Sequence, residues 1–280
     1  MMNDHSVIVE RIEKALDLAI AALKPFVPGA VEAKFKSGDD PVTEADHAVN
    51  RVLQETLLRD GEAWLSEESA DDLSRLNKER AWIVDPLDGT REFVAGIPEW
   101  CVSIAYVEDG VAVAGGIANP ATQEIFLGSS GGGLSYNGSR AHPSSKNHLQ
   151  GATVLASRSE VKRGEWERFR DAPFAVHPMG SVAYKLARVA AGLDDATWTL
   201  TPKHEWDVAA GVALIEAAGG FTGVLDFSRP VFNRNKSPLL RGLVASGPHL
   251  RDELIAFLQP HTQKAGIFEQ ENKKHSSPSA

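Results

Sequence analysis

Apolar side chains recur at helical spacing in two separate sets near the start of the chain. The first set predicts an amphipathic helix over residues 1–24 that is ended by Pro25. The second set follows a polar turn at residues 36–41 and predicts another helix, which begins with Thr43. The predicted buried positions are Ile8, Ile12, Ala15, Leu16, Ala19 and Leu23 in the first helix and Ala45, Val49, Val52, Leu53 and Leu57 in the second.

The pattern changes to that of β-strands over residues 101–136. Apolar runs at 101–107, 111–118 and 124–128 predict strands, and Asp109-Gly110 between the first two is typical of a β-hairpin. Shorter runs at 64–65 and 82–84 predict two more strands, each of which ends directly in carboxylates. An antiparallel sheet is therefore expected in the first half of the chain.

Strands and helices alternate from about residue 150. Strands are predicted at 153–157, 174–176 and 196–200, and helices near 160–170, at 181–191 and at 205–218. We therefore expect an α+β domain over residues 1–145, an α/β domain over residues 146–261, and a loose polar tail over residues 262–280.

Composition and charge narrow the class of protein. Apolar residues make up 42% and charged residues 24% of the 280 residues, as in an ordinary globular protein. The net charge of −9 argues against a nucleic-acid polymer as partner, because such a partner needs a basic face. No stretch approaches the roughly 20 apolar residues that span a bilayer, and no secretion signal is recognised, so we expect no membrane association. Cys101 is the only cysteine, which favours a cytoplasmic location.

The segment at 82–93 is the most informative about chemistry. A predicted strand ends in Asp85, and Asp88 follows on a tight turn. Two carboxylates placed in this way can converge on one or two hard cations, with the carbonyl of Leu87 as a further oxygen ligand. Gly89 allows close backbone approach, and the N–H groups that begin the next element face an anion. The alternative is a plain β-turn in which an aspartate caps a helix.

Three further segments place acidic side chains at the ends of predicted elements. Glu67 and Glu68 follow a strand, whereas Asp46 and Asp207 lie in the first turns of helices. Each has an ordinary alternative as a solvated turn, a cap or an acid that complements the helix dipole. As metal ligands they would offer only oxygen, which suits Mg²⁺, whereas zinc usually recruits clustered His or Cys.

Taken in order, these motifs resemble those of the inositol monophosphatase superfamily of metal-dependent, lithium-sensitive phosphatases. The similarity extends from Lys36 to about residue 247. It implies the layered αβαβα sugar-phosphatase fold, which combines α+β and α/β parts, and hydrolysis of a small phosphate monoester. The matching motifs are Pro41-Val-Thr-Glu-Ala-Asp46, Glu67-Glu68-Ser69, Asp85-Pro-Leu-Asp88-Gly-Thr90, Trp206-Asp207-Val-Ala-Ala-Gly211 and Ala218-Gly-Gly220.

The resemblance also implies roles for individual residues and two or three Mg²⁺ ions. One ion would take Glu67, Asp85 and the carbonyl of Leu87, and a second would take Asp85, Asp88 and Asp207. A third, weaker ion would lie near Glu67 and Asp46. Thr90, paired with Asp46 or Glu67, would orient and deprotonate the attacking water. The residues expected to bind substrate are Asp88, Gly89, Thr90, Ser181, Lys185, Lys203 and Asp207.

Two departures from inositol monophosphatases bear on the substrate. Leu200, seven positions before Asp207, stands where those enzymes carry a glutamate that contacts inositol hydroxyls. The Asp-Gly-Thr motif continues as Arg91-Glu92-Phe93, which is similar to 3'(2'),5'-bisphosphate nucleotidases. Further similarities to that branch are Pro202, and Gly180-Ser181 ahead of a helix that contains Lys185.

The sequence therefore favours adenosine 3',5'-bisphosphate as substrate. Inositol-1-phosphate or another sugar phosphate is the alternative, and a non-catalytic metal- and phosphate-binding relative is an alternative of another class. The oligomeric state stays open, with a homodimer among the alternatives. The candidate cations for a second phosphate are Lys185, Lys203, Arg234 and Lys236.

Overall fold

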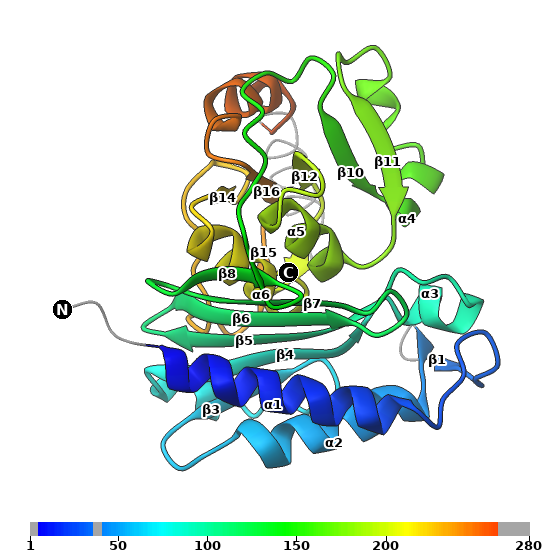
Figure 1. Ribbon diagram of the computed structural model, residues 1–280, viewed down its shortest axis with the longest axis vertical. Coiled ribbons are helices and arrows are strands. Elements are labelled where there is room, and N and C mark those ends of the chain that lie inside the picture. The colour runs from blue at the N-terminus through cyan, green and yellow to red at the C-terminus, as the bar shows by residue number, and fades with distance from the viewer. Residues whose placement is uncertain (1–4, 36–40, 263–280) are drawn as a thin grey trace, which may run out of the picture.

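The computed structural model describes residues 5–35 and 41–262, and they form five layers in the order α, β, α, β, α (Figure 1). This arrangement confirms the layered αβαβα fold with its α+β and α/β parts. Lys36, at the start of the similarity noted above, and residues 263–280 of the predicted tail lie outside the described residues.

The first layer consists of α1 (Ser6–Leu23) and α2 (Glu44–Leu57), which lie against one face of the larger sheet (Figure 1). Both helices are as predicted, and their predicted inward positions are buried except Ile8 and Val52, which are half-buried. α2 begins with a capping box, in which the Thr43 hydroxyl accepts from the Ala45 N–H and the Asp46 carboxylate accepts from the Thr43 N–H.

The second layer is a seven-stranded sheet whose strands follow one another in sequence order. β3 and β4 are parallel, and every later pair is antiparallel. The predicted hairpin at Asp109-Gly110 is present, with positive φ angles at both residues (48° and 82°). The strands are β3 (Ala63–Ser66), β4 (Arg80–Asp88), β5 (Cys101–Glu108), β6 (Val111–Asn119), β7 (Glu124–Ser129), β8 (Gly133–Tyr136) and β9 (Ser139–Ala141).

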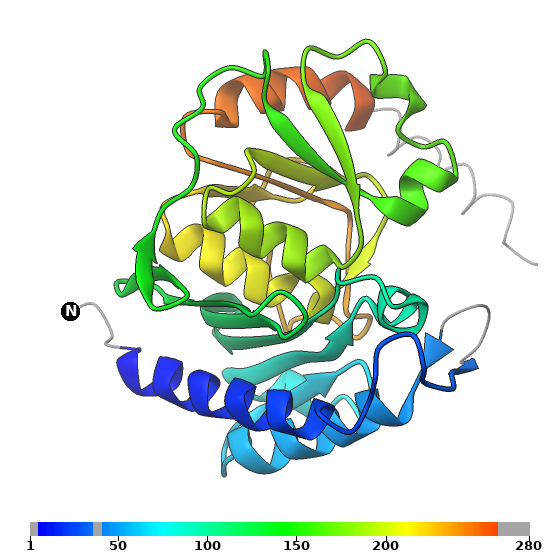
Figure 2. The same cartoon turned by 45° about the vertical axis from the view of Figure 1, so that its right-hand side comes forward.

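The third layer is made by α5 (Val182–Ala190) and α6 (Glu205–Ala217), which lie side by side between the two sheets (Figure 2). Small residues allow this close packing. A Cβ at Gly211 would stand 2.3 Å from Leu186 Cβ, and a Cβ at Gly115 of β6 would stand 2.7 Å from the Ala210 carbonyl. These glycines thus allow α6 to pack closely on β6 and against α5.

The fourth layer is a five-stranded sheet in the order β11-β10-β12-β16-β14. β10 is parallel to β11 and β12, and β16 is antiparallel to both of its neighbours. β14 and β16 were not predicted, because they are short buried strands without alternation. The strands are β10 (Thr153–Ser157), β11 (Ala175–Met179), β12 (Ala196–Thr199), β14 (Phe221–Gly223) and β16 (Leu243–Ser246).

The outer helices of the second half differ from the prediction. In place of one helix near 160–170, the chain forms α4 (Arg158–Lys162) and a 3-10 turn, η2 (Glu167–Phe169), separated by Gly164 at φ 78°. A helix over residues 251–262 was not predicted; Leu254 and Leu258 on it are fully buried. The remaining short elements are β1 (Lys34–Phe35), β2 (Pro41–Val42), η1 (Ser74–Asn77), α3 (Thr90–Ala95), β13 (Lys203–His204) and β15 (Leu239–Leu240).

The larger sheet lies within residues 1–145 and the smaller within 146–261, but α5 and α6 of the later part pack against the earlier sheet. The division into two domains therefore stays a prediction. None of the helices in the described residues is both long and apolar enough to cross a bilayer.

Candidate active site

A β-bulge in β4 sets the direction of the first two carboxylates. Asp85 pairs with Ser103 and Asp88 with Cys101, so a longer step along β4 matches a shorter one along β5. Residues three apart on a regular strand face opposite sides of the sheet. The bulge returns Asp88 to the face of Asp85, which is the face that packs against α5 and α6.

Hydrogen bonds fix both carboxylates. Asp85 is 2% exposed, and its Oδ1 accepts from the Leu87 N–H at 3.0 Å. Asp88 Oδ2 accepts from the Ser181 hydroxyl at 2.7 Å and from the Ala183 N–H at 2.6 Å. Asp88 thereby ties the bulge of the larger sheet to the start of α5.

Glu67 and Asp207 reach the same place from other elements. β3 runs parallel to β4 with Ser66 opposite Val84, so Glu67 emerges beside Asp85. Asp207 lies in the first turn of α6, where its Oδ2 accepts from the His204 N–H at 3.0 Å. One cavity of about 400 Å³ is lined by all four carboxylates, together with Leu87, Gly89, Thr90, Ser181, Lys185 and Lys203.

The electrostatics of this cluster suit a cation. Burial raises the pKa of Asp85 well above its usual value, and the charges of Glu67, Asp88 and Asp207 raise it further. Burial, Asp88 and Glu67 likewise raise the pKa of Asp207. Burial also raises the pKa of Asp88, although its hydrogen bonds and nearby lysines oppose the shift.

The cavity offers carboxylate oxygens as donors for a metal ion. Within the described ranges, no three Asp, Glu, His or Cys side chains already stand where they could hold one ion. Several of the carboxylate oxygens accept hydrogen bonds from the protein instead. The available donors are carboxylate oxygens that repel one another, which fits a hard divalent cation such as Mg²⁺. The assignment of individual ligands stays a prediction.

Thr90 and Asp46 form a second feature of the site. Thr90 Oγ1 lies 3.1 Å from Asp46 Oδ1 and 3.0 Å from the Leu87 carbonyl oxygen, and it can donate its single proton to either. Asp46 is 2% exposed, and its Oδ2 accepts from the N–H (2.8 Å) and hydroxyl (2.6 Å) of Thr43. Burial is the largest cause that raises the pKa of Asp46. Asp46 contacts Thr90, which lines the cavity, but Asp46 does not line the cavity itself.

Gly89 adopts a backbone conformation that favours glycine, with φ 97°. A Cβ there would stand 2.8 Å from the Glu99 carbonyl oxygen and 3.1 Å from Trp100 Cα. The turn that carries Asp88 into α3 therefore requires a glycine.

The two predicted lysines line the cavity, but both already bond to other protein groups. Lys185 is 3% exposed and donates to the Ser181 carbonyl at 2.8 Å, and burial lowers its pKa to about 8. Lys203 forms an ion pair with Glu160 at 3.2 Å. Glu160 is itself buried and accepts from the Thr199 hydroxyl at 2.6 Å.

The structure corrects the expected position of Leu200. Leu200 packs in the outer core of the smaller sheet and lines a separate small cavity with Glu160 and Trp166, not the one that holds the carboxylates. Of the other candidate cations, Arg234 is 3.3 Å from Asp109 at the β5–β6 hairpin. Neither Arg234 nor Lys236 lines the cavity.

Sequence reasoning did not find several residues of the cavity wall. Arg158 Nη2 donates to both carboxylate oxygens of Glu99, at 2.7 and 2.6 Å, and the Gly180 N–H donates to Glu99 at 2.7 Å. Arg158 and Gly180 follow the carboxyl ends of the parallel strands β10 and β11, where α/β sheets place binding sites. Their position after two predicted strands of an α/β region was the feature of the sequence that could have indicated them. The other wall residues, to which the sequence assigned no individual role, are Pro41, Arg91, Glu92, Ser157, Ser159, Val182, His204 and Trp206.

The layered fold and the cavity lined by four carboxylates fit a metal-dependent phosphatase, and comparisons with known proteins identify the family. The Inositol monophosphatase family matches residues 6–263, and the chain belongs to this family of metal-dependent phosphatases. It is 35% identical over 205 residues to an inositol-1-monophosphatase of Mesorhizobium japonicum, covering 70% of this chain and 76% of the relative.

Two further relatives match over more of their length. The chain is 32% identical over 267 residues to inositol monophosphatase 3 of Solanum lycopersicum, covering 88% of this chain and 97% of the relative. A solved structure of inositol monophosphatase from Anabaena has a TM-score of 0.74 and 27% identity, covering 95% of this chain and 97% of that one. The family identification from the motifs is thereby confirmed.

Proposed function

We propose that the protein hydrolyses a polyol or sugar monophosphate of the inositol-1-phosphate kind, with Mg²⁺ as cofactor. The observation that carries this proposal is the convergence of Glu67, Asp85, Asp88 and Asp207 on one cavity, in front of the Thr90–Asp46 pair. The product would be inorganic phosphate and the free hydroxyl compound.

The carboxylates would hold two or three ions. Glu67, Asp85 and the Leu87 carbonyl would hold the first, Asp85, Asp88 and Asp207 the second, and Glu67 with Asp46 a weaker third. When bound, Mg²⁺ neutralises phosphate charge and lowers the pKa of water. Ser181, the Asp88 and Asp207 side chains and the Gly89 and Thr90 backbone would then position the phosphate end of the substrate.

Thr90 would orient the attacking water. When its single proton points to Asp46, the lone pairs of Oγ1 face the cavity and can accept from a water molecule. Asp46 cannot turn away, because Thr43 holds its other oxygen through two hydrogen bonds. A proton could thus move from the water through Thr90 to Asp46. Glu67 is the alternative partner for Thr90 that the family resemblance implies.

The cations of the cavity bear on the substrate. Adenosine 3',5'-bisphosphate has a second phosphate, which needs basic partners. Lys185 donates to backbone carbonyls and Lys203 is paired with Glu160, so a second phosphate would have to displace these bonds. Leu200, the residue that argued against inositol, packs away from the cavity. The named relatives also support an inositol phosphate over a nucleotide.

The bisphosphate nucleotide is the second candidate, because both lysines line the cavity together with Arg91 and Arg158. A phosphate-release panel with inositol-1-phosphate, adenosine 3',5'-bisphosphate and fructose-1,6-bisphosphate in Mg²⁺ separates the candidates. We expect the highest kcat/KM for inositol-1-phosphate. At least tenfold higher efficiency for the nucleotide would restore the nucleotidase assignment, and no release from any compound would contradict a phosphatase.

Lithium should inhibit the enzyme, as the family resemblance implies.

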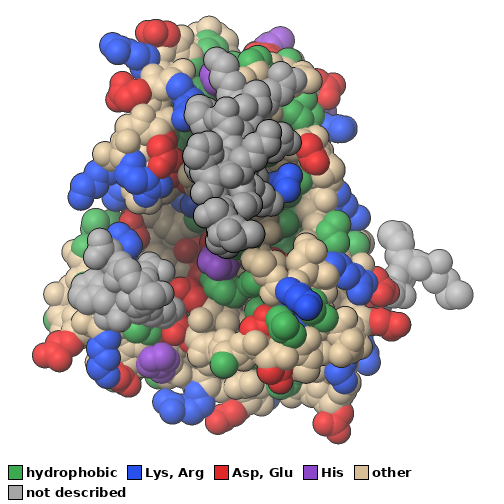
Figure 3. Space-filling view, turned by 180° about the vertical axis from the view of Figure 1, so that it is seen from behind, with side chains coloured by type: hydrophobic (Ala, Val, Ile, Leu, Met, Phe, Trp, Pro, Cys, Tyr) green, Lys and Arg blue, Asp and Glu red, His purple; other side chains and the backbone are tan. Residues whose placement is uncertain are grey.

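The partner would be a small phosphorylated molecule and not a nucleic-acid polymer, since acidic and basic side chains are interspersed on the face shown in Figure 3. A cytoplasmic location is expected from the single Cys101, which is buried and free. Membrane association is not part of the proposal. A homodimer is an alternative that size measurement in solution would decide.

A further inference from the structure

Glu92, in the first turn of α3, presents a carboxylate to the cavity that the reaction described above does not use. Its side chain is half-buried. In the described part of the chain, no hydroxyl or N–H of another residue donates to that carboxylate. Lys185 contributes charge nearby, but its ammonium donates to the carbonyls of Ser181 and Met179. Glu92 therefore retains its capacity to accept hydrogen bonds.

Gly180, on the opposite wall, leaves room for this side chain. A Cβ at Gly180 would stand 2.5 Å from both Cγ and Cδ of Glu92 and 2.7 Å from Oε1. The φ of Gly180 is not in the left-handed region. The absence of a side chain, rather than backbone conformation, is what position 180 requires.

The wall around Gly180 is fixed to the catalytic centre. Its N–H donates to Glu99, which Arg158 holds with two hydrogen bonds. The next residue, Ser181, donates to Asp88. The wall against which the Glu92 side chain lies is thus bonded to the carboxylate cluster that would bind metal and phosphate.

We infer that Glu92 is a specificity-determining residue, whose carboxylate accepts hydrogen bonds from hydroxyl groups of the polyol or sugar part of the substrate. This inference rests on the proposed phosphatase function. An ionised carboxylate only accepts hydrogen bonds and repels phosphate, so its partner in the substrate must be a donor. A hydroxyl on the carbon next to the phosphate ester meets this requirement. A site built to bind a hydroxyl strongly disfavours the analogue that lacks it.

Steady-state kinetics on a matched pair of substrates test the inference. Inositol-1-phosphate and cyclohexyl phosphate have the same ring, but only the first carries hydroxyl groups. Glu92→Ala should raise KM for inositol-1-phosphate about tenfold with little change in kcat, because one hydrogen bond to a charged group is lost before and during the reaction. Neither constant should change for cyclohexyl phosphate.

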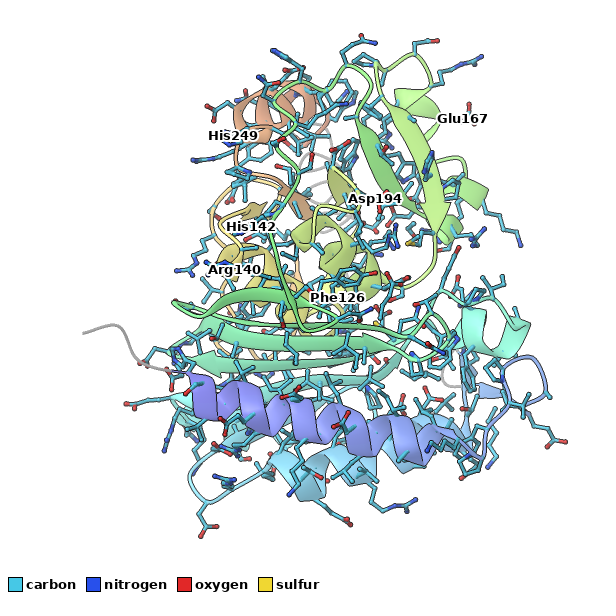
Figure 4. The ribbon with its side chains drawn as sticks, viewed as in Figure 1. Phe126, Arg140, His142, Glu167, Asp194 and His249 are labelled. Carbon is cyan, nitrogen blue, oxygen red and sulfur yellow. The ribbon has the colours of Figure 1, made fainter. Side chains whose placement is uncertain are left out.

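Glu167→Ala is the control. Glu167 is exposed on η2, far from the middle layer (Figure 4), so its removal should change neither substrate's kinetics. Glu92→Gln, which keeps the side-chain volume, is the second variant should Glu92→Ala unfold at a lower temperature. It should show a smaller loss, confined to the same substrate.

Gly180→Ala tests the contact between the two walls. As a single substitution, Gly180→Ala should raise KM for inositol-1-phosphate about as much as Glu92→Ala does, since the new Cβ displaces the Glu92 side chain. In the Glu92→Ala background it should cause little further loss, which a double-mutant cycle detects as coupling. Independent, additive losses would contradict the proposed contact.

The outcomes are distinguishable. If Glu92→Ala changes the kinetic constants equally for both substrates, Glu92 acts on the phosphate group or the metal site. If it changes them for neither substrate, Glu92 binds no substrate group. Either result overturns the inference and leaves the phosphatase proposal intact. Wild-type protein that releases phosphate from neither compound in Mg²⁺ would overturn the proposed function and this inference with it.

Discussion

Thr90 Oγ1 lies 3.1 Å from Asp46 Oδ1, which joins the start of α3 to the first turn of α2. The same aspartate forms the capping box of α2 with Thr43. A residue that a sequence pattern assigns to a helix cap is therefore also placed to receive a proton from the cavity.

Two substitutions of Thr90 test whether its hydroxyl group is needed for catalysis. Thr90→Ala removes the hydroxyl that orients the water, and kcat should fall about 100-fold, within the usual range for a positioned acid–base group. Thr90→Ser keeps the hydroxyl and should stay within about tenfold of wild type. Steady-state phosphate release measures both. A Thr90→Ala variant as active as Thr90→Ser would contradict the assigned role.

Asp85→Asn should abolish turnover and leave the fold intact. The charges of Glu67, Asp88 and Asp207 all act on Asp85. Asp85 is assigned to two ions, so losing its charge should weaken the binding of both. The amide oxygen can still accept from the Leu87 N–H, which the carboxylate now accepts at 3.0 Å. The checks are kcat at saturating Mg²⁺ and the thermal unfolding midpoint in chelator. More than a few per cent of wild-type activity would refute the ligand assignment.

Glu205 predicts a pH dependence of stability. It is 2% exposed, and burial raises its pKa to about 7, despite the N–H of Asn233 at 2.8 Å and the charge of Arg75. The folded state therefore binds the proton more tightly than the unfolded state. Its stabilising contribution is complete below the ordinary pKa of 4.5 and is lost as the pH rises to about 7.

Glu205→Gln mimics the protonated form of Glu205, so its unfolding free energy should not show this decline as the pH rises. Between pH 4.5 and 8, the unfolding free energy of wild type should decline by roughly 3 kcal/mol relative to the variant. Urea unfolding of both proteins with saturating Mg²⁺ measures the difference. Parallel pH profiles would mean that Glu205 titrates near its ordinary pKa in the folded protein.

Most of the fold could be predicted because the early elements carry strong periodicity. The residues of α1 and α2 repeat at helical spacing, and β5 and β6 are joined by Asp109-Gly110. The helix over residues 251–262 was missed although it buries Leu254 and Leu258. The interruption at Gly164 was also missed, because one glycine does not by itself end a predicted helix.

The site could be predicted only where a motif carried it. Glu67, Asp85, Asp88 and Asp207 were chosen from motif order, and the structure brings them to one cavity. Pro86 within β4 marks an irregularity in the strand, but it does not show that the bulge turns Asp88 to the face of Asp85. The wall made by Glu92, Glu99, Arg158 and Gly180 depends on contacts between distant segments, which periodicity cannot reveal.

Leu200 illustrates the limit of carrying a position over from a family. Its place seven residues before Asp207 suggested a substrate wall, but the side chain packs with the outer core of the smaller sheet. Spacing along the chain fixes the end of β12 and not the direction of the residue that follows it.

A magnesium titration of chelator-treated protein decides whether the four carboxylates form the centre of a metal-dependent phosphatase. Phosphate release from inositol-1-phosphate is measured as Mg²⁺ is added back, for wild type and for Asp85→Asn. We predict no release without Mg²⁺, a saturable return of activity in wild type, and none in the variant. Release that continues unchanged in chelator, or that returns equally in Asp85→Asn, would contradict this assignment.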